Sequence, residues 1–283
     1  MHINYCEQGQ SVKEACQIAA KLGFEGIEFR RRSRTAGKTD EEYLSEIEEG
    51  VKGHDFQELI FAGGPNAMGK TDEELDAIVA EELAFYKKVK ERFPVKVLNC
   101  FTGPLLNPIL GISGRRYSYH GAAVANERHW EAATRAYQAF GDGLTQLGLK
   151  AGFETHGGYL HDSMASTQKL VELINRPSIG TLWDQVNQLL LDEPTTVAQG
   201  IEISGKSLHA VHFKNALILP DGGYVAVGLS FGQVNVREQV RLLQEIGYDG
   251  PLVLEAPRAG DRVEFAKQDL AYFKSILQDL DIR

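Results

Sequence analysis

The sequence contains little cysteine and no long hydrophobic run. Its three cysteines, Cys6, Cys16 and Cys100, are too few and too scattered for a disulfide framework or a zinc knuckle. We therefore expect buried, reduced thiols and a cytoplasmic protein. No run of about 18 apolar residues occurs, so we expect no membrane-spanning helix. Residues 1–6 already have a strand-like pattern, and we expect no signal segment before them.

The chain also lacks an excess of basic charge. Its 283 residues carry a formal net charge of −9, which argues against nucleic acid as a partner, because such binding needs a basic surface. Low-complexity tracts, linkers and short repeats are missing as well. No G-x-G-x-x-G follows the first strand, which disfavours an open dinucleotide-binding sheet. We expect a small-molecule ligand and neither nucleic acid nor membrane as partner.

The remaining pattern is a regular alternation of strands and helices. With 43% hydrophobic residues, the chain can build a large core. Three capping boxes, at Ser11, Thr39 and Thr71, predict the starts of the first three helices. Strict alternation predicts a parallel sheet, and eight pairs in this length predict an α/β fold, a single (β/α)8 TIM barrel domain over residues 1–283. The predicted strands are 3–6, 26–30, 59–64, 95–101, 152–155, 179–184, 208–213 and 252–255.

Two long segments interrupt the alternation. Residues 103–126 follow the fourth strand and show no clear periodicity, so we expect a lid or binding loop on the catalytic face. A glycine-rich loop is expected over residues 219–232.

Four of the predicted strands end on a side chain of the kind that binds metals. These are Glu154, Asp184, His212 and Glu255. They are roughly 30 to 40 residues apart, which is about one strand–helix–strand crossover each. The carboxyl ends of barrel strands converge at the mouth, and three carboxylates with one imidazole suit a divalent cation. The sequence therefore predicts a metal site formed by these four residues.

The alternation of side chains along each strand supports this prediction. Residues two apart share a face, so Gly152, Ala210 and Val253 lie below Glu154, His212 and Glu255, as a packed barrel interior requires. His209 has the opposite parity from His212, and we expect it to face the helices in a structural role.

The segments around these residues resemble the xylose isomerase-like superfamily of barrels. The resemblance covers essentially the whole chain. This superfamily includes sugar and sugar-phosphate isomerases, ketose 3-epimerases, inosose dehydratases and endonuclease IV-type enzymes. It implies that Glu154, Asp184, His212 and Glu255 bind one divalent metal ion, and that the protein forms a homo-oligomer, a dimer or a tetramer. The segments are Phe153-Glu154-Thr155-His156, Leu182-Trp183-Asp184-Gln185-Val186-Asn187, Val211-His212-Phe213-Lys214-Asn215 and Leu254-Glu255.

The sequence departs from this family pattern at two positions. Asn187 stands where ketose epimerases usually have histidine, and Asn215 follows Lys214 where the family often has aspartate. The first difference puts an epimerase-type substrate pose in doubt. Neither difference changes a predicted metal ligand.

The resemblance implies proton transfer next to a carbonyl group, and the chemistry of these residues fits it. A metal ion offsets the charge of an enediolate, and Glu154 and Glu255 on opposite walls take and return the proton. We expect Mn²⁺ or Mg²⁺, with Co²⁺ or Zn²⁺ as alternatives. The predicted enzyme is a metal-dependent isomerase or epimerase of a sugar, sugar phosphate or sugar acid. The alternatives are a dehydratase or lyase on a keto-sugar, inosose or 3-keto-glycoside, an endonuclease IV-like nuclease, and a non-catalytic sugar-binding barrel.

Several polar residues near the expected mouth are candidates for substrate binding. The basic ones are suited to a phosphate or carboxylate on the substrate. Arg31, Arg32, Arg34, Arg115 and Arg116 belong to the same basic group, while Tyr117, His120 and Trp130 are alternatives for the pocket wall. The substrate-binding candidates are His156, Asn187, Lys214, Glu28, Arg30 and Arg258. Glu28 is a candidate for a hydrogen bond to a sugar or to a ligand histidine, and His156 for contact with substrate or for orienting Glu154.

Overall fold

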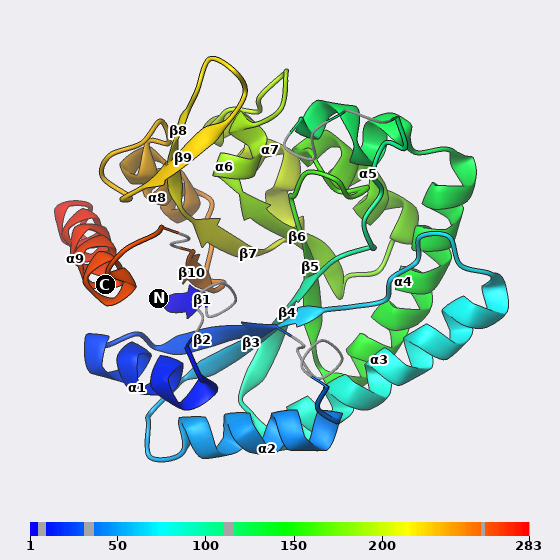
Figure 1. Cartoon of the computed structure of the whole chain (residues 1–283), viewed down its shortest axis with the longest axis horizontal. Coiled ribbons are helices and arrows are strands. Elements are labelled where there is room, and N and C mark those ends of the chain that lie inside the picture. The colour runs from blue at the N-terminus through cyan, green and yellow to red at the C-terminus, as the bar shows by residue number, and fades with distance from the viewer. Residues whose placement is uncertain (5–9, 31–36, 110–111, 113–115, 256–257, 283) are drawn as a thin grey trace.

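The computed structural model describes residues 1–4, 10–30, 37–109, 112, 116–255 and 258–282. In this part of the chain, eight parallel strands form a closed barrel in the order β1-β10-β7-β6-β5-β4-β3-β2 (Figure 1). Strand β1 closes the barrel because it pairs with both β10 and β2. The predicted (β/α)8 TIM barrel is thus confirmed. The barrel strands are β1 (His2–Asn4), β2 (Gly26–Arg30), β3 (Glu58–Gly63), β4 (Val95–Cys100), β5 (Lys150–Glu154), β6 (Ile179–Asp184), β7 (Leu208–Phe213) and β10 (Leu252–Leu254).

Helices between the strands form a ring around the barrel (Figure 1). The capping boxes at Ser11, Thr39 and Thr71 are confirmed, since each hydroxyl accepts a hydrogen bond from the N–H three residues ahead. The α-helices are α1 (Val12–Leu22), α2 (Asp40–Val51), α3 (Asp72–Arg92), α4 (Glu127–Leu147), α5 (Met164–Ile174), α6 (Gln185–Leu189), α7 (Val197–Ser204), α8 (Val236–Glu245) and α9 (Arg262–Asp279); the 3₁₀ helices are η1 (Tyr117–Tyr119), η2 (Gly121–Val124) and η3 (Gly205–Ser207). No described helix is long and apolar enough to cross a bilayer.

The hydrophobic core has two parts. The larger part lies between the strands and the helices and includes Phe61 and Phe85, whose rings meet edge to face. The smaller part fills the barrel interior with Val97, Leu182 and Ala210, which are 6%, 0% and 0% exposed. The barrel is therefore a packed cylinder whose axis is closed below its mouth.

Two histidines lie below this small cluster, at the N-terminal ends of the strands. His2 packs over Gly26, and His209 packs over Gly180 and brings Nδ1 to 3.1 Å from the carbonyl oxygen of Ala151. A register shift between β6 and β7 coincides with this placement. The expectation that His209 faces the helices is therefore wrong, because the irregular pairing breaks the parity on which it depended.

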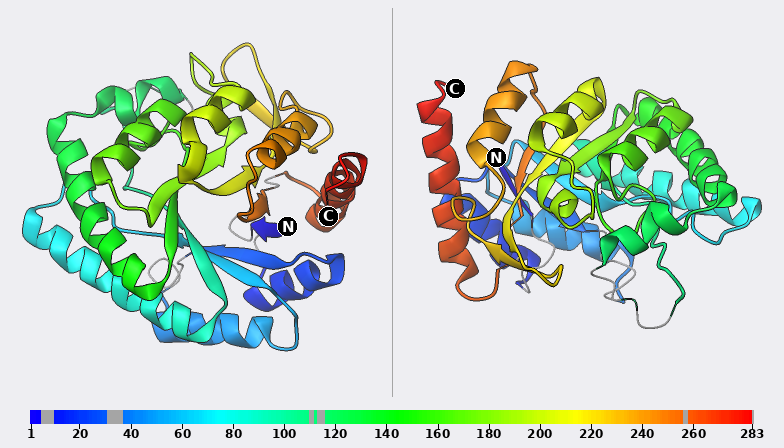
Figure 2. Two further views of the ribbon diagram at one scale, coloured as in Figure 1. Left: turned by 180° about the vertical axis from the view of Figure 1, so that it is seen from behind. Right: turned by 90° about the horizontal axis from the view of Figure 1, so that it is seen from above.

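Two elements lie outside the predicted pattern. The expected glycine-rich loop 219–232 belongs to an antiparallel hairpin, because β8 (Asn215–Ile218) precedes it and β9 (Tyr224–Val227) lies within it; the hairpin projects from one end of the barrel (Figure 2, right). Its turn contains Gly222 with φ +81°, a conformation that favours glycine. The short helix α6 follows β6 directly, and Asp184 caps it by accepting a hydrogen bond from the Asn187 N–H.

The long segment 103–126 is fastened to the exit of β5. Leu105 N–H donates to the carbonyl oxygen of Gly158 at 2.7 Å, and Ala122 N–H donates to Asp162 Oδ2 at 2.8 Å. The segment contains the two 3₁₀ helices η1 and η2, and its residues 110–111 and 113–115 lie outside the described part. Its position beside β5 places it next to the end of the strand that carries Glu154.

Candidate metal centre

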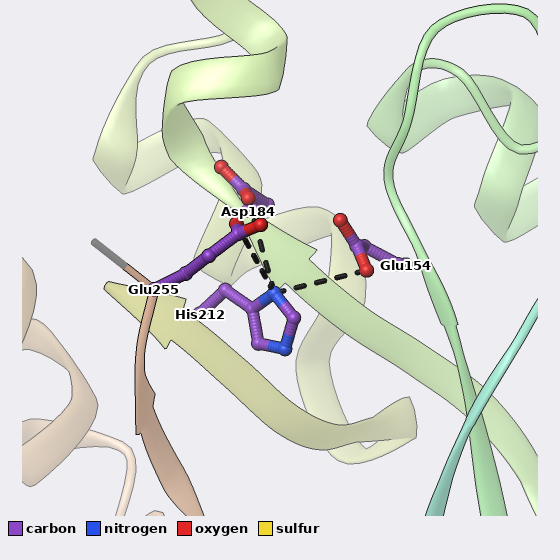
Figure 3. A group of neighbouring side chains, drawn as sticks. All are labelled: Glu154, Asp184, His212 and Glu255. Atoms are coloured by element: carbon purple, nitrogen blue, oxygen red, sulfur yellow. Dashed lines mark ion pairs between the residues drawn. The ribbon is translucent and has the colours of Figure 1, made fainter. Parts of the chain in front are cut away.

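The four predicted metal ligands converge at the mouth of the barrel (Figure 3). Glu154 and Asp184 are the last residues of β5 and β6, His212 lies near the end of β7, and Glu255 follows β10. One donor atom from each lies within 4.8 Å of the donor atoms of the others. Neighbouring parallel strands bring side chains that are distant in the sequence to one point.

The imidazole of His212 is the centre of this group. Its Nδ1 lies 3.7 Å from Glu154 Oε2, 4.0 Å from Asp184 Oδ2 and 3.7 Å from Glu255 Oε2. This nitrogen is buried and has no hydrogen-bond partner among the described residues. An unsatisfied buried nitrogen that faces three carboxylates fits a divalent cation, which would bind all four side chains.

The other nitrogen of His212 is held by Glu28. Nε2 donates to Glu28 Oε2 at 2.8 Å, so Nδ1 is the nitrogen left for a cation. Glu28 is fully buried, and its second oxygen accepts hydrogen bonds from Asn4 at 3.2 Å and Asn99 at 2.9 Å. The structure thus supports the expected contact of Glu28 with His212, and it does not bring Glu28 into the cleft as a substrate-binding residue.

Lys214 brings a positive charge into the same site. Its Nζ lies 2.7 Å from Asp184 Oδ2 and 2.8 Å from Glu255 Oε2. Burial opposes ionisation of the lysine, but the carboxylates of Asp184 and Glu255 outweigh it and hold its pKa well above its usual value. The ammonium group therefore offsets part of the negative charge of the quartet.

The ligands differ in the charge that their surroundings favour. Burial raises the pKa of Asp184 to about 6, against the opposing effect of Lys214. Burial also opposes ionisation of Glu255, but Lys214 and His212 outweigh it and hold its pKa well below its usual value. For His212, burial disfavours the charged form, yet Glu28 and Glu154 hold its pKa well above its usual value.

Two asparagine amides contact Glu154, whereas the Lys214 ammonium group contacts Glu255. Asn99 Nδ2 donates to Glu154 Oε2 at 2.8 Å, and Asn187 Nδ2 lies 3.5 Å from Oε1. Asn187 is therefore brought to the quartet, as the sequence predicts. Asn99 was not predicted, although a polar residue on the same face as Val97 in an apolar strand could have signalled it.

His161 is a second residue that the sequence analysis missed. Its Nδ1 donates to the backbone carbonyl of Glu154, its Nε2 accepts the Thr102 N–H at 3.2 Å, and its ring stacks between Phe153 and Tyr159. Burial lowers its pKa to about 3, so the ring stays neutral. It links the exits of β4 and β5 and so fixes the backbone that carries Glu154.

An open cleft of about 500 Å³ leads to Glu154 and Glu255. Arg30 and His156 line it, as predicted, together with the aromatic rings of Phe101 and Tyr159. The centroid of the His156 ring lies 5.4 Å from that of Tyr159 and 5.8 Å from that of Tyr117, so the cleft has one aromatic wall. Such a mixture of aromatic and charged groups is typical of a site for a polar small molecule.

The sequence profile of the family described as xylose isomerase-like TIM barrel matches residues 16–276. The chain belongs to this family. No curated protein sequence matches the chain. The predicted resemblance is thereby confirmed.

Solved structures of similar fold carry several activities. D-psicose 3-epimerase from Clostridium cellulolyticum H10, crystallised with D-tagatose, has a TM-score of 0.74 and 16% identity over 98% of each chain. The IolI protein with a bound zinc atom has a TM-score of 0.72 and 16% identity over 98% of this chain and 96% of that chain. The probable 3-DHS dehydratase AsbF from Bacillus anthracis, involved in petrobactin synthesis, has a TM-score of 0.69 and 17% identity over 97% of this chain and 99% of that chain. At these identities the likeness shows the fold.

In this xylose isomerase-like barrel, Arg258 is not brought into the cleft. Its guanidinium pairs with Asp269, donates to the carbonyl oxygen of Phe265 at 3.2 Å and packs on the Phe265 ring. These contacts hold it against α9, so the structure does not support the prediction that it binds substrate.

The other aromatic and basic candidates are mostly placed away from the quartet. Trp130 packs under the Lys169 ammonium group, and His120 Nδ1 accepts the N–H of Asn107 at 2.9 Å. Arg116 packs on the Tyr119 ring. The predicted candidates Arg31, Arg32, Arg34 and Arg115 lie outside the described residues.

Proposed function

We propose that the protein is a divalent-metal-dependent isomerase or epimerase that acts on a sugar or a sugar derivative through an enediolate. The observation that carries this proposal is the convergence of Glu154, Asp184, His212 and Glu255 around one point, with the buried Nδ1 of His212 facing the carboxylates. Membership of the xylose isomerase-like family supports it. A divalent ion held by these four side chains would supply positive charge next to a substrate oxygen.

We assign proton abstraction to Glu154. A base next to the substrate removes the proton on the carbon beside the carbonyl, and the electron pair moves to form the enediolate. Glu154 is held by the neutral amides of Asn99 and Asn187, whereas the cation of Lys214 holds Glu255 in its ionised form. The Glu154 carboxylate, which lines the cleft and is not paired with Lys214, is left to contact the substrate. Glu255 is assigned the second acid–base role, on the opposite wall.

The substrate is proposed to lie between the aromatic wall and the quartet. His156 and Arg30 line the cleft that opens on Glu154, and Asn187 lies beside the same carboxylate. Arg30 suits a carboxylate or phosphate on the substrate, while Lys214 can donate a hydrogen bond to a sugar oxygen.

For the ion, Mn²⁺ or Mg²⁺ remains our proposal. Three carboxylates and one imidazole provide an oxygen-rich set, which hard and intermediate divalent cations prefer. Co²⁺ and Zn²⁺ also accept such a set, and the related IolI protein contains zinc. We further propose a cytoplasmic location, one domain over residues 1–283 and a homo-oligomer.

Lys214 favours a second candidate, a dehydratase or lyase on a keto-sugar, inosose or 3-keto-glycoside. The first step is the same, but the bond from the neighbouring carbon to oxygen then breaks, and the departing oxygen takes a proton. The ammonium group of Lys214, 2.8 Å from Glu255, would supply that proton. The similar fold of a probable dehydratase agrees with this alternative.

Incubation of the Mn²⁺-loaded protein with ketoses and 3-keto-glycosides in D₂O tests both candidates. Deuterium on the carbon beside the carbonyl, together with an isomeric sugar, is the result expected for an isomerase or epimerase. Loss of water or of an alcohol from the substrate would contradict the isomerase or epimerase and support the dehydratase or lyase. Sugar binding without exchange or elimination would instead favour a non-catalytic barrel. The E154Q variant, which preserves shape, should abolish exchange, and exchange at the wild-type rate in that variant would remove Glu154 from the mechanism.

A further inference from the structure

Asn99 lies on β4, a strand that contributes no metal ligand. It is 1% exposed and pairs in register with Ala62 of β3 and Gly152 of β5. Its side chain points into the barrel mouth, above Val97 of the interior cluster. A buried amide in this position needs partners for its polar atoms.

The two protons of the Asn99 amide go to two different carboxylates. Nδ2 lies 2.9 Å from Glu28 Oε1 and 2.8 Å from Glu154 Oε2. Both oxygens belong to buried carboxylates, which accept hydrogen bonds, so the NH₂ group and not the carbonyl oxygen must face them. Each glutamate leads onward to the candidate metal centre, Glu154 as a ligand and Glu28 through its hydrogen bond to His212.

The carbonyl oxygen of the Asn99 amide indicates that folding stability alone does not explain why asparagine occupies this position. Asn99 Oδ1 is buried and has no hydrogen-bond partner among the described residues. An unsatisfied buried oxygen costs free energy that leucine, of similar size, would not. The benefit of asparagine here is therefore in the two donors, which keep two neighbouring buried carboxylates in place.

We infer that Asn99 is a positioning residue that fixes two metal ligands at once, Glu154 directly and His212 through Glu28. Its amide holds Glu154 Oε2 on the side of His212, 3.7 Å from Nδ1, and it holds Glu28 in the orientation that turns Nδ1 of His212 toward the site. The quartet is thus arranged before an ion binds. This inference rests on the proposed metal site and not on the identity of the substrate.

Co²⁺ binding to the wild-type protein and to N99L tests the inference without a substrate. Calorimetric titration gives the affinity, and the visible absorption of bound Co²⁺ reports the ligand geometry. We expect N99L to raise the Kd for Co²⁺ by about 10- to 100-fold, the usual effect of removing a partner that orients metal ligands, and to shift the absorption bands. A folded N99L variant with wild-type Kd and bands would overturn the inference.

Asn4 provides a matched control, because it is the other asparagine that donates to Glu28. N4L removes one hydrogen bond from Glu28 and leaves Glu154 with its contact to Asn99. We expect a smaller rise in Kd than in N99L. An equal rise would mean that Asn99 acts through Glu28 alone, which contradicts the inference.

Two further variants keep the test decisive if N99L does not fold. The serine hydroxyl of N99S donates only one hydrogen bond and should raise the Kd less than full removal. In the double variant N99S/E28Q, the two effects should be non-additive, because both act on the orientation of His212. Additive effects would contradict the link through Glu28. Failure of the wild-type protein itself to bind Co²⁺ would remove the metal site and the proposed function with it.

Discussion

His209 and His212 lie on the same strand, β7, and both are buried, but they occupy opposite levels of the barrel. His209 lies at the lower end over a glycine and bonds to one backbone carbonyl, and burial lowers its pKa to about 4. His212 lies at the mouth among carboxylates, where Glu28 and Glu154 outweigh burial and hold its pKa well above the usual value. Both histidines are buried but favour opposite charge states, so the neighbouring groups decide what each histidine can do.

The strongest expected contrast is in metal binding. H212Q removes the nitrogen that faces the three carboxylates and should weaken Co²⁺ binding by more than about 100-fold, since even the loss of an outer partner costs 10- to 100-fold. H209Q keeps a side-chain donor for the Ala151 carbonyl and should bind the ion as the wild type does. Calorimetric titration of both variants measures the contrast, and a similar loss of affinity in the two would break the comparison.

A second contrast is in acid stability. The folded protein keeps His209 neutral down to about pH 4, whereas the unfolded chain takes up the proton near pH 6.5. Below pH 6.5 the unfolded state therefore binds more protons, and the free energy of unfolding falls as the pH is lowered toward 4. His209 should account for about 3 kcal/mol of this loss. His2, with a pKa of about 4, contributes in the same direction.

Urea unfolding of the wild type and H209Q between pH 7 and pH 4 measures this effect. The glutamine side chain does not titrate, so H209Q should lose less stability on acidification. If the free energy of unfolding fell equally with pH in the two proteins, His209 would not be held neutral at the lower end of the barrel.

The smallest expected contrast is in stabilisation by the ion. A ligand at 100 times its Kd stabilises the folded state by about 2.7 kcal/mol. Mn²⁺ or Co²⁺ should therefore raise the melting temperature of the wild type and of H209Q by the same amount, and leave H212Q nearly unchanged. Thermal unfolding with and without the ion provides the measurement. A rise in H212Q equal to that of the wild type would place the ion elsewhere.

The sequence predicted the barrel and the quartet because both depend on regular spacing. Residues at the ends of successive parallel strands must meet at one end of a barrel, whatever their exact contacts. Capping boxes such as Ser11 with Glu14 also act within one turn of helix, so the chain reveals them locally.

The features that were missed depend on contacts between distant segments or on a change of register. Asn99 acquires its importance only when β2, β4 and β5 bring Glu28 and Glu154 to either side of it. The side on which His209 lies follows from irregular pairing of β6 with β7, which period-two alternation does not include.

The β8–β9 hairpin was also missed, although it had a local signal, because Asp221-Gly222-Gly223 between apolar runs is typical of a tight turn.

The interior cluster of Val97, Leu182 and Ala210 has a kinetic consequence. Because the cluster fills the barrel beneath the quartet, the cleft at the mouth is the route by which the proposed ion and substrate would reach it. Under the proposed function, an ion held by the quartet would lie deeper than a substrate in the cleft, and a bound substrate would hinder release of the ion. A chelator should therefore remove the metal from the metal-loaded protein more slowly when substrate is present.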